Sequence, residues 1–238
     1  MRVGLCLTSN DTSALARAHP DDAQKLRRLV VPLAPDWRWE PVDMQAGVFP
    51  DDVRDFDAYV ILGSPASVHD DLPWMRRLLD FVRQAHAADI PMVGLCLGHQ
   101  AIALALGGAV TKSASGLVMG TRETVFTPEP WMEPAAERLT LYAAHKEEVS
   151  RLPDGARTIG TARDCAHASF AIGERIMTTQ YHPEMTRAFM EGLVDMAEGE
   201  IDAGAEAARA EIAAGAEGET FARWIVSFLR RQAPLPAR

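Results

Sequence analysis

Cysteine is scarce in this sequence of 238 residues, and the three that occur, Cys6, Cys96 and Cys165, lie far apart. They form no C-x-x-C pair, so neither a disulfide framework nor a zinc knuckle is indicated. No apolar stretch approaches the length of a membrane span. The first residues form only a brief apolar run without a small-residue cleavage site, so we expect no signal peptide. These absences favour a cytoplasmic protein with free thiols.

Positive charge is also in short supply. Lys and Arg total 24 against 33 Asp and Glu, which gives a formal charge of −9, and there is no basic block. We therefore expect no nucleic-acid partner and no membrane partner. The histidines show no H-x-x-H or H-E-x-x-H spacing and there is no P-loop, so we predict neither a metal site nor a cofactor.

The chain does have ample core material, with 47% hydrophobic and 24% charged residues. Its first part alternates apolar runs with amphipathic segments. The apolar runs are residues 3–7, 37–42, 57–62 and 90–95. The predicted helical segments are residues 11–30, with an interruption at residues 19–22, and residues 72–88 and 99–106. This alternation predicts an α/β fold with a mostly parallel central sheet and helices on both faces.

In the second part of the chain, the predicted secondary structure changes twice. Residues 121–181 contain short β-like runs separated by turn signals, which predicts a small additional β region. Residues 191–219 then carry nine acidic residues and one basic residue, and their glycines argue against one unbroken helix. We expect residues 1–190 to form one domain and residues 191–238 a helical extension packed on it. The acidic helices are expected to be a solvated surface rather than part of a catalytic site.

The most informative motif is GLCLGHQ at residues 94–100, where a buried strand runs directly into a predicted helix. A sharp strand-to-helix turn of this kind is a nucleophile elbow, with Cys96 where hydrolases often place serine. The helix N-terminus favours a thiolate, and the N–H of Leu97 is the first donor expected for an oxyanion. An isolated cysteine is commonly a buried core residue, but the G-x-C-x-G setting favours a nucleophile.

A second motif, QYHPE at residues 180–184, carries a histidine and a carboxylate two residues apart. Residues i and i+2 of a strand point the same way, so Glu184 is expected near the imidazole of His182. A carboxylate on one ring nitrogen fixes the tautomer and leaves the other nitrogen for a thiol. His-Pro-Glu alone is often a surface turn, but together with the elbow it predicts a Cys-His-Glu site.

A third motif, LGSPASV at residues 62–68, follows the predicted strand at residues 57–62. Ligands bind at the carboxyl ends of strands in open α/β sheets, and small residues allow backbone N–H groups to approach a reacting carbonyl. Alone, this segment would be an ordinary strand-to-helix turn.

With these three motifs, the sequence resembles the class I glutamine amidotransferase family of the Cys-His-Glu type. The resemblance is strong from residue 57 to about residue 185, and includes HKEEV at residues 145–149 followed by Leu-Pro. It implies a flavodoxin-like three-layer sandwich and a γ-glutamyl thioester intermediate. By this resemblance Cys96 is the nucleophile, His182 is the base and acid, and Glu184 orients the imidazole.

The resemblance also implies where substrate binds. It places the substrate-binding positions at Gly63, Gln100 and His145, and the oxyanion hole at the N–H groups of Ser64 and Leu97. Three positions depart from the family pattern. Ser64 stands where a second glycine is frequent, Glu147 stands where Asp is usual, and residues 118–120 are VMG where many relatives have a glutamate before the glycine.

The same thioester chemistry fits two functions. The chain is either a glutaminase subunit that supplies ammonia to an acceptor synthetase, or a free-standing hydrolase or transferase of γ-glutamyl peptides, like stand-alone relatives that resemble the amidotransferase domain of GMP synthase. Only the leaving group differs, ammonia or a larger amine. A catalytically inactive binding or regulatory module on this fold is an alternative of another class.

Overall fold

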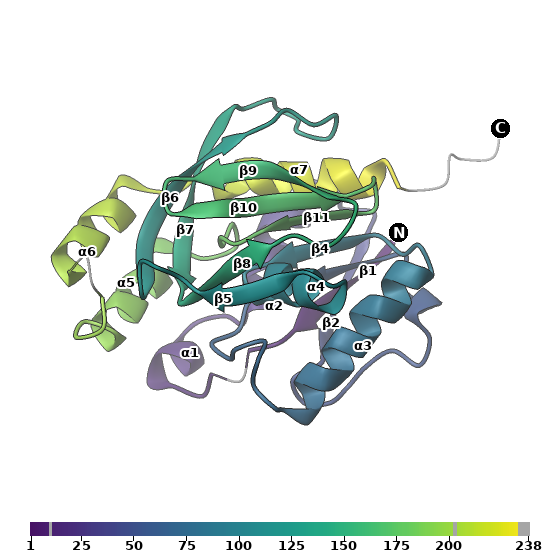
Figure 1. The fold of residues 1–238 in the computed structure, drawn as a ribbon, viewed down its shortest axis with the longest axis horizontal. Coiled ribbons are helices and arrows are strands. Elements are labelled where there is room, and N and C mark those ends of the chain that lie inside the picture. The colour runs from purple at the N-terminus through teal and green to yellow at the C-terminus, as the bar shows by residue number, and fades with distance from the viewer. Residues whose placement is uncertain (10, 202–203, 233–238) are drawn as a thin grey trace.

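The computed structural model describes residues 1–9, 11–201 and 204–232. In that part of the chain, nine strands form one sheet in the order β2-β1-β3-β4-β11-β10-β9-β6-β7 (Figure 1). A separate two-stranded ribbon pairs β5 (Ala109–Lys112) with β8 (Glu147–Arg151). The architecture is therefore α/β, with one large sheet and helices packed against it.

One half of the sheet is parallel. Its strands are β2 (Arg38–Asp43), β1 (Arg2–Leu7), β3 (Ala58–Ile61), β4 (Met92–Leu95) and β11 (Ile176–Thr179). Every residue of β3 and β4 is buried, because helices cover both faces of these central strands. The strands predicted at residues 3–7, 37–42, 57–62 and 90–95 are confirmed.

The other half of the sheet is antiparallel. It consists of β10 (Cys165–Ile172), β9 (Ala156–Ala162), β6 (Val118–Phe126) and β7 (Arg138–His145). The prediction of a mostly parallel sheet is correct only for the half that carries the motifs, and most of the predicted small β region extends the main sheet. The reason is connection length: β9, β10 and β11 follow one another through tight turns, whereas parallel neighbours need a long crossover.

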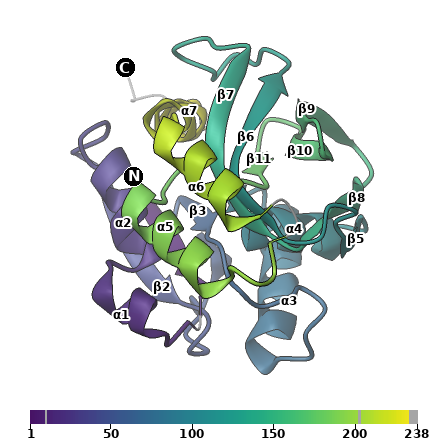
Figure 2. The same cartoon turned by 90° about the vertical axis from the view of Figure 1, so that its left-hand side faces the viewer.

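Helices cover both faces of the sheet. They are α1 (Ala14–Ala18), α2 (Asp22–Val30), α3 (Pro73–Ala87), α4 (Leu97–Ala105), α5 (Arg187–Met196), α6 (Ala205–Ala214) and α7 (Gly218–Arg230), with a 3-10 turn η1 (Val53–Asp55). The buried side chains of α2 and α7 share one apolar cluster, and those of α3 and α4 share another. Figure 2 shows α2 and α7 on one side of the sheet and α3 on the other. The layered arrangement expected from the sequence is thus present.

The C-terminal helices pack against the rest of the fold. Helix α7 buries an almost continuous stripe: Phe221, Ala222, Trp224, Ile225, Val226, Phe228 and Leu229. Helix α6 packs Ile212 against Met190 of α5 and Met119 of β6. The domain boundary predicted at residue 190 falls within α5. Residues 202–203 and 233–238 of the predicted extension lie outside the described residues.

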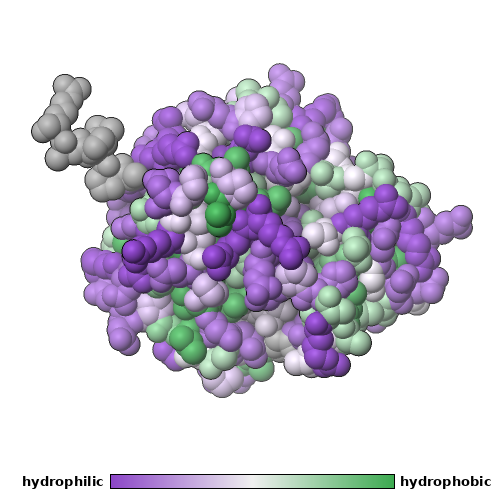
Figure 3. Space-filling model, turned by 180° about the vertical axis from the view of Figure 1, so that it is seen from behind, coloured by the Kyte–Doolittle hydropathy of each residue, from purple (hydrophilic) through white to green (hydrophobic). Residues whose placement is uncertain are grey.

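The surface shows few large apolar groups. The rear face is mainly hydrophilic, with small apolar areas separated by polar ones (Figure 3). Within residues 1–9, 11–201 and 204–232, no helix combines the length and apolarity needed to span a bilayer. Over the same ranges, no three His, Cys, Asp or Glu side chains gather in a group that could hold a metal ion.

Replacing Trp224 by Ala should destabilise the fold by about 3–5 kcal/mol, because a large buried side chain leaves a cavity. Trp224 is fully buried, contacts the ring of Phe126 edge-on at 4.9 Å between centroids, and donates a hydrogen bond from Nε1 to the carbonyl of Pro134 (2.8 Å). Urea unfolding followed by circular dichroism measures the change. The exposed neighbour Arg223→Ala is the control and should shift stability by less than about 0.5 kcal/mol. An equal effect of both variants would contradict this packing.

Candidate active site

The predicted nucleophile elbow is present between β4 and α4. Cys96 has φ +48° and ψ −102°, a conformation that non-glycine residues rarely adopt and that costs about 1–3 kcal/mol. The turn is possible because its flanking residues lack side chains. A Cβ on Gly94 would lie 2.7 Å from the backbone of Gly98, and a Cβ on Gly98 would overlap the carbonyl of Ile61. The elbow therefore holds Cys96 at the carboxyl end of the central strand β4, at the start of α4.

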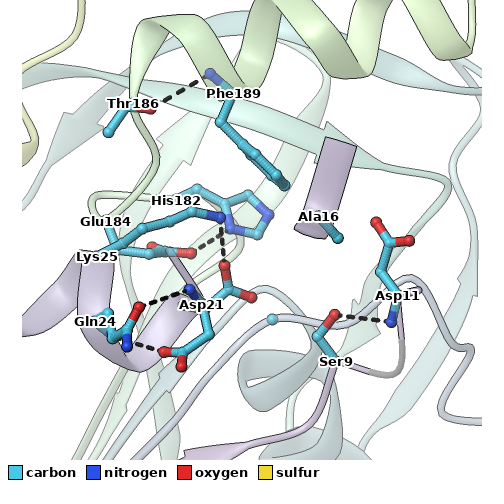
Figure 4. A network of polar contacts seen from close by, with 12 residues as sticks. Ser9, Asp11, Ala16, Asp21, Gln24, Lys25, His182, Glu184, Thr186 and Phe189 are labelled. Carbon is cyan, nitrogen blue, oxygen red and sulfur yellow. Dashed lines mark hydrogen bonds and ion pairs between the residues drawn. The ribbon is translucent and has the colours of Figure 1, made fainter. Parts of the chain in front are cut away.

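His182 and Glu184 also come together. His182 Nδ1 lies 2.7 Å from Glu184 Oε1, and both side chains are buried (Figure 4). Strand β11 ends at Thr179, so strand alternation does not place them as the sequence predicted. Instead His182 is held by an isolated bridge in which its N–H donates to the carbonyl of Tyr142 on β7 (2.8 Å). The other ring nitrogen, Nε2, is buried without a hydrogen-bond partner among the described residues.

The charge state of His182 follows from its neighbours. Burial lowers its pKa, but the negative charges of Cys96 and Glu184 outweigh burial and hold the pKa of His182 well above its ordinary value. These two interactions favour the charged, imidazolium form of His182. Such an imidazolium can donate a proton as soon as a basic leaving group forms beside it.

At Gly63, the segment of residues 62–68 packs closely against the segments that carry Cys96 and His182. A Cβ on this glycine would lie 2.8 Å from His182 Cε1 and 3.7 Å from Cys96 Cβ. Its φ is not positive, so the residue is required for space rather than for backbone conformation. Ser64 also has an ordinary φ and keeps its backbone N–H. Among the described residues, the N–H of Ser64 makes no turn or loop hydrogen bond to another backbone group. The N–H of Leu97 is the first of α4, where helix N–H groups have no intrahelical acceptor.

A cleft of about 380 Å³ opens over these groups, and Gly63, Ser64, Cys96 and His182 all line it. The predicted substrate-binding residue Gln100 lines it too. Motifs that lie far apart in the sequence therefore share one cavity.

The polar side of the cleft is held by hydrogen bonds. Gln100 Nε2 donates to the carbonyl of Glu147 (2.7 Å) and to Gln180 Oε1 (3.2 Å). The Glu147 carboxylate accepts from Ser67 Oγ (2.7 Å). His145 lines the cleft with a nearly buried ring, and burial lowers its pKa to about 3, which leaves the imidazole neutral.

Sequence reasoning missed the contact of Gln180 with the thiol. Its Nε2 donates to Cys96 Sγ (3.7 Å), and its side chain is fully buried. The sequence offered no signal for it, because β11 ends at Thr179 and the contact joins residues 84 positions apart.

Sequence reasoning also missed a buried ion pair beside Glu184. Lys25 Nζ lies 2.8 Å from Asp22 Oδ1 and 3.3 Å from the ring centroid of Phe189. Burial raises the pKa of Asp22, Lys25 lowers it and Glu184 raises it further. Figure 4 shows Lys25 and Phe189 close to His182 and Glu184. Nothing in the sequence marks this pair, since α2 has the pattern of an ordinary amphipathic helix.

The three thiols differ in their surroundings. Cys6 and Cys165 lie in the apolar clusters, and burial raises the pKa of each. Cys96 alone among them lines the cleft.

Known proteins resemble this chain over most of its length. The family model described as "Glutamine amidotransferase class-I" matches residues 35–191. Gamma-glutamyl peptidase 4 of Arabidopsis thaliana is 27% identical over 210 residues, which covers 83% of this chain and 84% of that protein. One subunit of the glutamine-hydrolyzing GMP synthase of Saccharolobus solfataricus is 27% identical over 136 residues, which covers 57% of this chain and 71% of that protein. A solved glutamine amido transferase from Methylobacillus flagellatus has the same fold, with a TM-score of 0.75, 22% identity and coverage of 99% and 96%.

Replacing Gln180 by Leu should slow alkylation of Cys96 by iodoacetamide at neutral pH by about tenfold, because hydrogen bonds to charged groups contribute about 1.5–3 kcal/mol. Mass spectrometry of the labelled peptide gives the rate, and Cys96→Ala gives the background from the other two thiols. Labelling of Gln180→Leu at the unaltered rate would show that the contact does not stabilise the thiolate.

His99 should make the fold sensitive to acid. Its ring is fully buried and burial lowers its pKa to about 3, whereas an unfolded histidine titrates near 6.5. Between these values only the unfolded state binds the proton, so stability is present above about pH 6.5 and is lost as the pH falls towards 3. From pH 7 to pH 5, His99→Met should lose about 2 kcal/mol less than the original protein in urea titrations. The control is the exposed His86→Gln, and a His99→Met profile that matches it would refute the prediction.

Proposed function

Because this chain belongs to the class I glutamine amidotransferase family, we propose that it hydrolyses the amide bond of glutamine or another γ-glutamyl compound through a thioester on Cys96. The observation that carries the proposal is one arrangement: Cys96 on a strained elbow, next to a His182 imidazole whose other nitrogen contacts Glu184. These three side chains supply a nucleophile, a proton carrier and an orienting carboxylate.

In the first step, the Cys96 thiolate attacks the carbonyl carbon of the γ-amide and the carbonyl oxygen becomes an oxyanion. The N–H groups of Ser64 and Leu97 are free to donate to that oxygen. The intermediate collapses as the C–N bond breaks, and the His182 imidazolium gives its proton to the departing amine. A γ-glutamyl thioester and a neutral imidazole remain.

In the second step, His182 accepts a proton from a water molecule, and the resulting hydroxide attacks the thioester. The same two N–H groups hold the oxyanion again. The C–S bond then breaks, glutamate leaves, and the thiolate and imidazolium are restored. Glu184 serves both steps by fixing the ring and stabilising its positive charge, as a triad carboxylate does.

The polar side of the cleft binds the γ-glutamyl group. Both N–H bonds of the Gln100 amide are directed to the protein, so its oxygen is the atom left for the substrate. Gly63 provides the space, and the neutral ring of His145 forms part of the wall.

Two versions of this function remain distinct. In one, the chain is a free-standing hydrolase or transferase of γ-glutamyl compounds, which the match over most of a gamma-glutamyl peptidase favours. In the other, it is a glutaminase subunit that passes ammonia to a synthetase, as the similarity to a GMP synthase subunit suggests. An inactive regulatory module is disfavoured, because the cysteine, the histidine and the glutamate are all present and adjacent.

Replacing Cys96 by Ala should abolish glutamate release, by at least about 10⁴-fold, because the nucleophile is lost. His182→Ala should be nearly as damaging, whereas Glu184→Ala should retain more activity, since it removes only the orienting group. A coupled glutamate assay with glutamine and γ-glutamyl peptides measures all three. Circular dichroism checks that each variant is folded. Full activity in Cys96→Ala would refute the proposed mechanism.

A further inference from the structure

The cleft has one wall that the proposed chemistry leaves unexplained. Five apolar side chains line it: Leu117, Met119, Met185, Phe189 and Leu193. We refer to these residues as the apolar wall. All except Phe189 belong to the apolar cluster beneath α5 and α6, so they pack together as one surface. Leu117, Met185 and Leu193 are only partly buried, which leaves them able to contact a ligand in the cleft.

The apolar wall lies on the His182 side of the cleft. Met185 follows His182 by three residues, and α5 then carries Phe189 and Leu193 one turn apart. From the sheet, Met119 pairs with Ala144 on β7, two residues from the Tyr142 that bridges to His182. The wall is therefore built from the segment that follows His182 and from the start of β6, the strand that pairs with the one His182 bridges to.

The polar wall is assembled separately. Ser67 follows the oxyanion turn, Gln100 lies on α4 and Glu147 begins β8, and hydrogen bonds join the three. The two walls thus differ in chemistry, and they meet at Cys96 and His182.

This division matches the two halves of a γ-glutamyl amide. The γ-glutamyl half carries an ammonium and a carboxylate and is suited to the polar wall. The amine half takes its proton from His182, so it leaves on the side where the apolar wall stands. When glutamine is the substrate this half is only ammonia, which contacts no apolar surface. A cleft of about 380 Å³ falls in the range of sites for larger ligands, about 300–1,000 Å³.

We propose that the apolar wall is the binding site for the amine half of the substrate, and that the preferred substrates are γ-glutamyl amides of amines bearing an apolar alkyl or aryl group. This inference rests on the proposed function and narrows it, because an enzyme devoted to releasing ammonia from glutamine would gain nothing from the wall.

Contacts with two neighbouring side chains fix the orientation of the Phe189 ring. The Lys25 ammonium lies over one face of its ring, 3.3 Å from the centroid, and His19 contacts the ring edge-on at 5.4 Å between centroids. A ring fixed on these sides is preorganised to contact an alkyl chain without further loss of side-chain freedom.

The test is a homologous series of substrates: glutamine and the γ-glutamyl amides of methylamine, propylamine and 3-methylbutylamine. Each methylene that reaches the apolar wall should raise kcat/KM by about two- to fourfold. We expect the 3-methylbutylamide to exceed the methylamide by at least about tenfold. Glutamate release by the full chain is the readout for every member.

Two variants on α5 locate the effect. Leu193→Asn should reduce the advantage of the 3-methylbutylamide over the methylamide by about three- to tenfold, because one apolar contact is lost. Met196→Asn changes a side chain on the same helix that is 57% exposed and does not line the cleft, and it should preserve the advantage.

The outcomes separate the two proposals. A flat series in the original protein, with glutamine hydrolysed as well as any amide, would overturn the apolar subsite and leave the proposed function standing. No glutamate from any substrate would overturn the proposed function itself. A rising series that both variants preserve equally would place the apolar contact elsewhere and refute the role of this wall.

Discussion

The close approach of three chain segments at Cys96 is the constraint on which the rest of the site depends. The end of β3, the nucleophile elbow and the segment after β11 meet so tightly that residues 63, 94 and 98 have no room for a side chain. This packing holds Cys96 in its unfavourable backbone conformation and fixes His182 against it. Strain of this kind persists only where the surroundings over-determine it. Here the buried parallel strands β3 and β4 supply that rigidity.

The second constraint on the site is that its buried charges must be paired, and this pairing involves residues outside the three motifs. Burying a charge is costly unless a partner lies close by, and the site buries several. His182 is matched by Cys96 and Glu184, and the carboxylate of Asp22, next to Glu184, is matched by Lys25. Helix α2 therefore does more than cover the sheet, because it places a compensated ion pair beside His182 and Glu184. Removing only Lys25 would leave Asp22 without its cation in a region that already holds Glu184.

The sequence predicted the local features of this site and missed the long-range ones. The sharp turn at Cys96, the turn at residues 63–64 and the His182–Glu184 contact each lie within one short segment. Residue type was therefore sufficient to predict them, although the strand alternation assumed for His182 and Glu184 is absent. The Gln180 contact with Cys96 joins residues 84 positions apart, and the Lys25–Phe189 contact joins α2 to α5. Contacts between residues so far apart leave no periodic pattern in the sequence. The mixed sheet was missed for a similar reason: apolar runs reveal strands, but the direction of each strand depends on the connections between them.

Helix α5 connects the C-terminal part of the chain to the chemistry. It begins five residues after His182, its inner face packs on α6 and β6, and Phe189 and Leu193 line the cleft. Helix α6 is in turn anchored to the sheet by Glu211, which accepts hydrogen bonds from the backbone of Thr121 (3.0 Å) and from Arg122 (3.2 Å). An acidic, alanine-rich segment that looked like solvated surface in the sequence thus sets the position of one wall of the site. If that wall selects the amine half of the substrate, then specificity is determined by α5 and the start of β6, while the proposed thioester chemistry is determined by the three motifs.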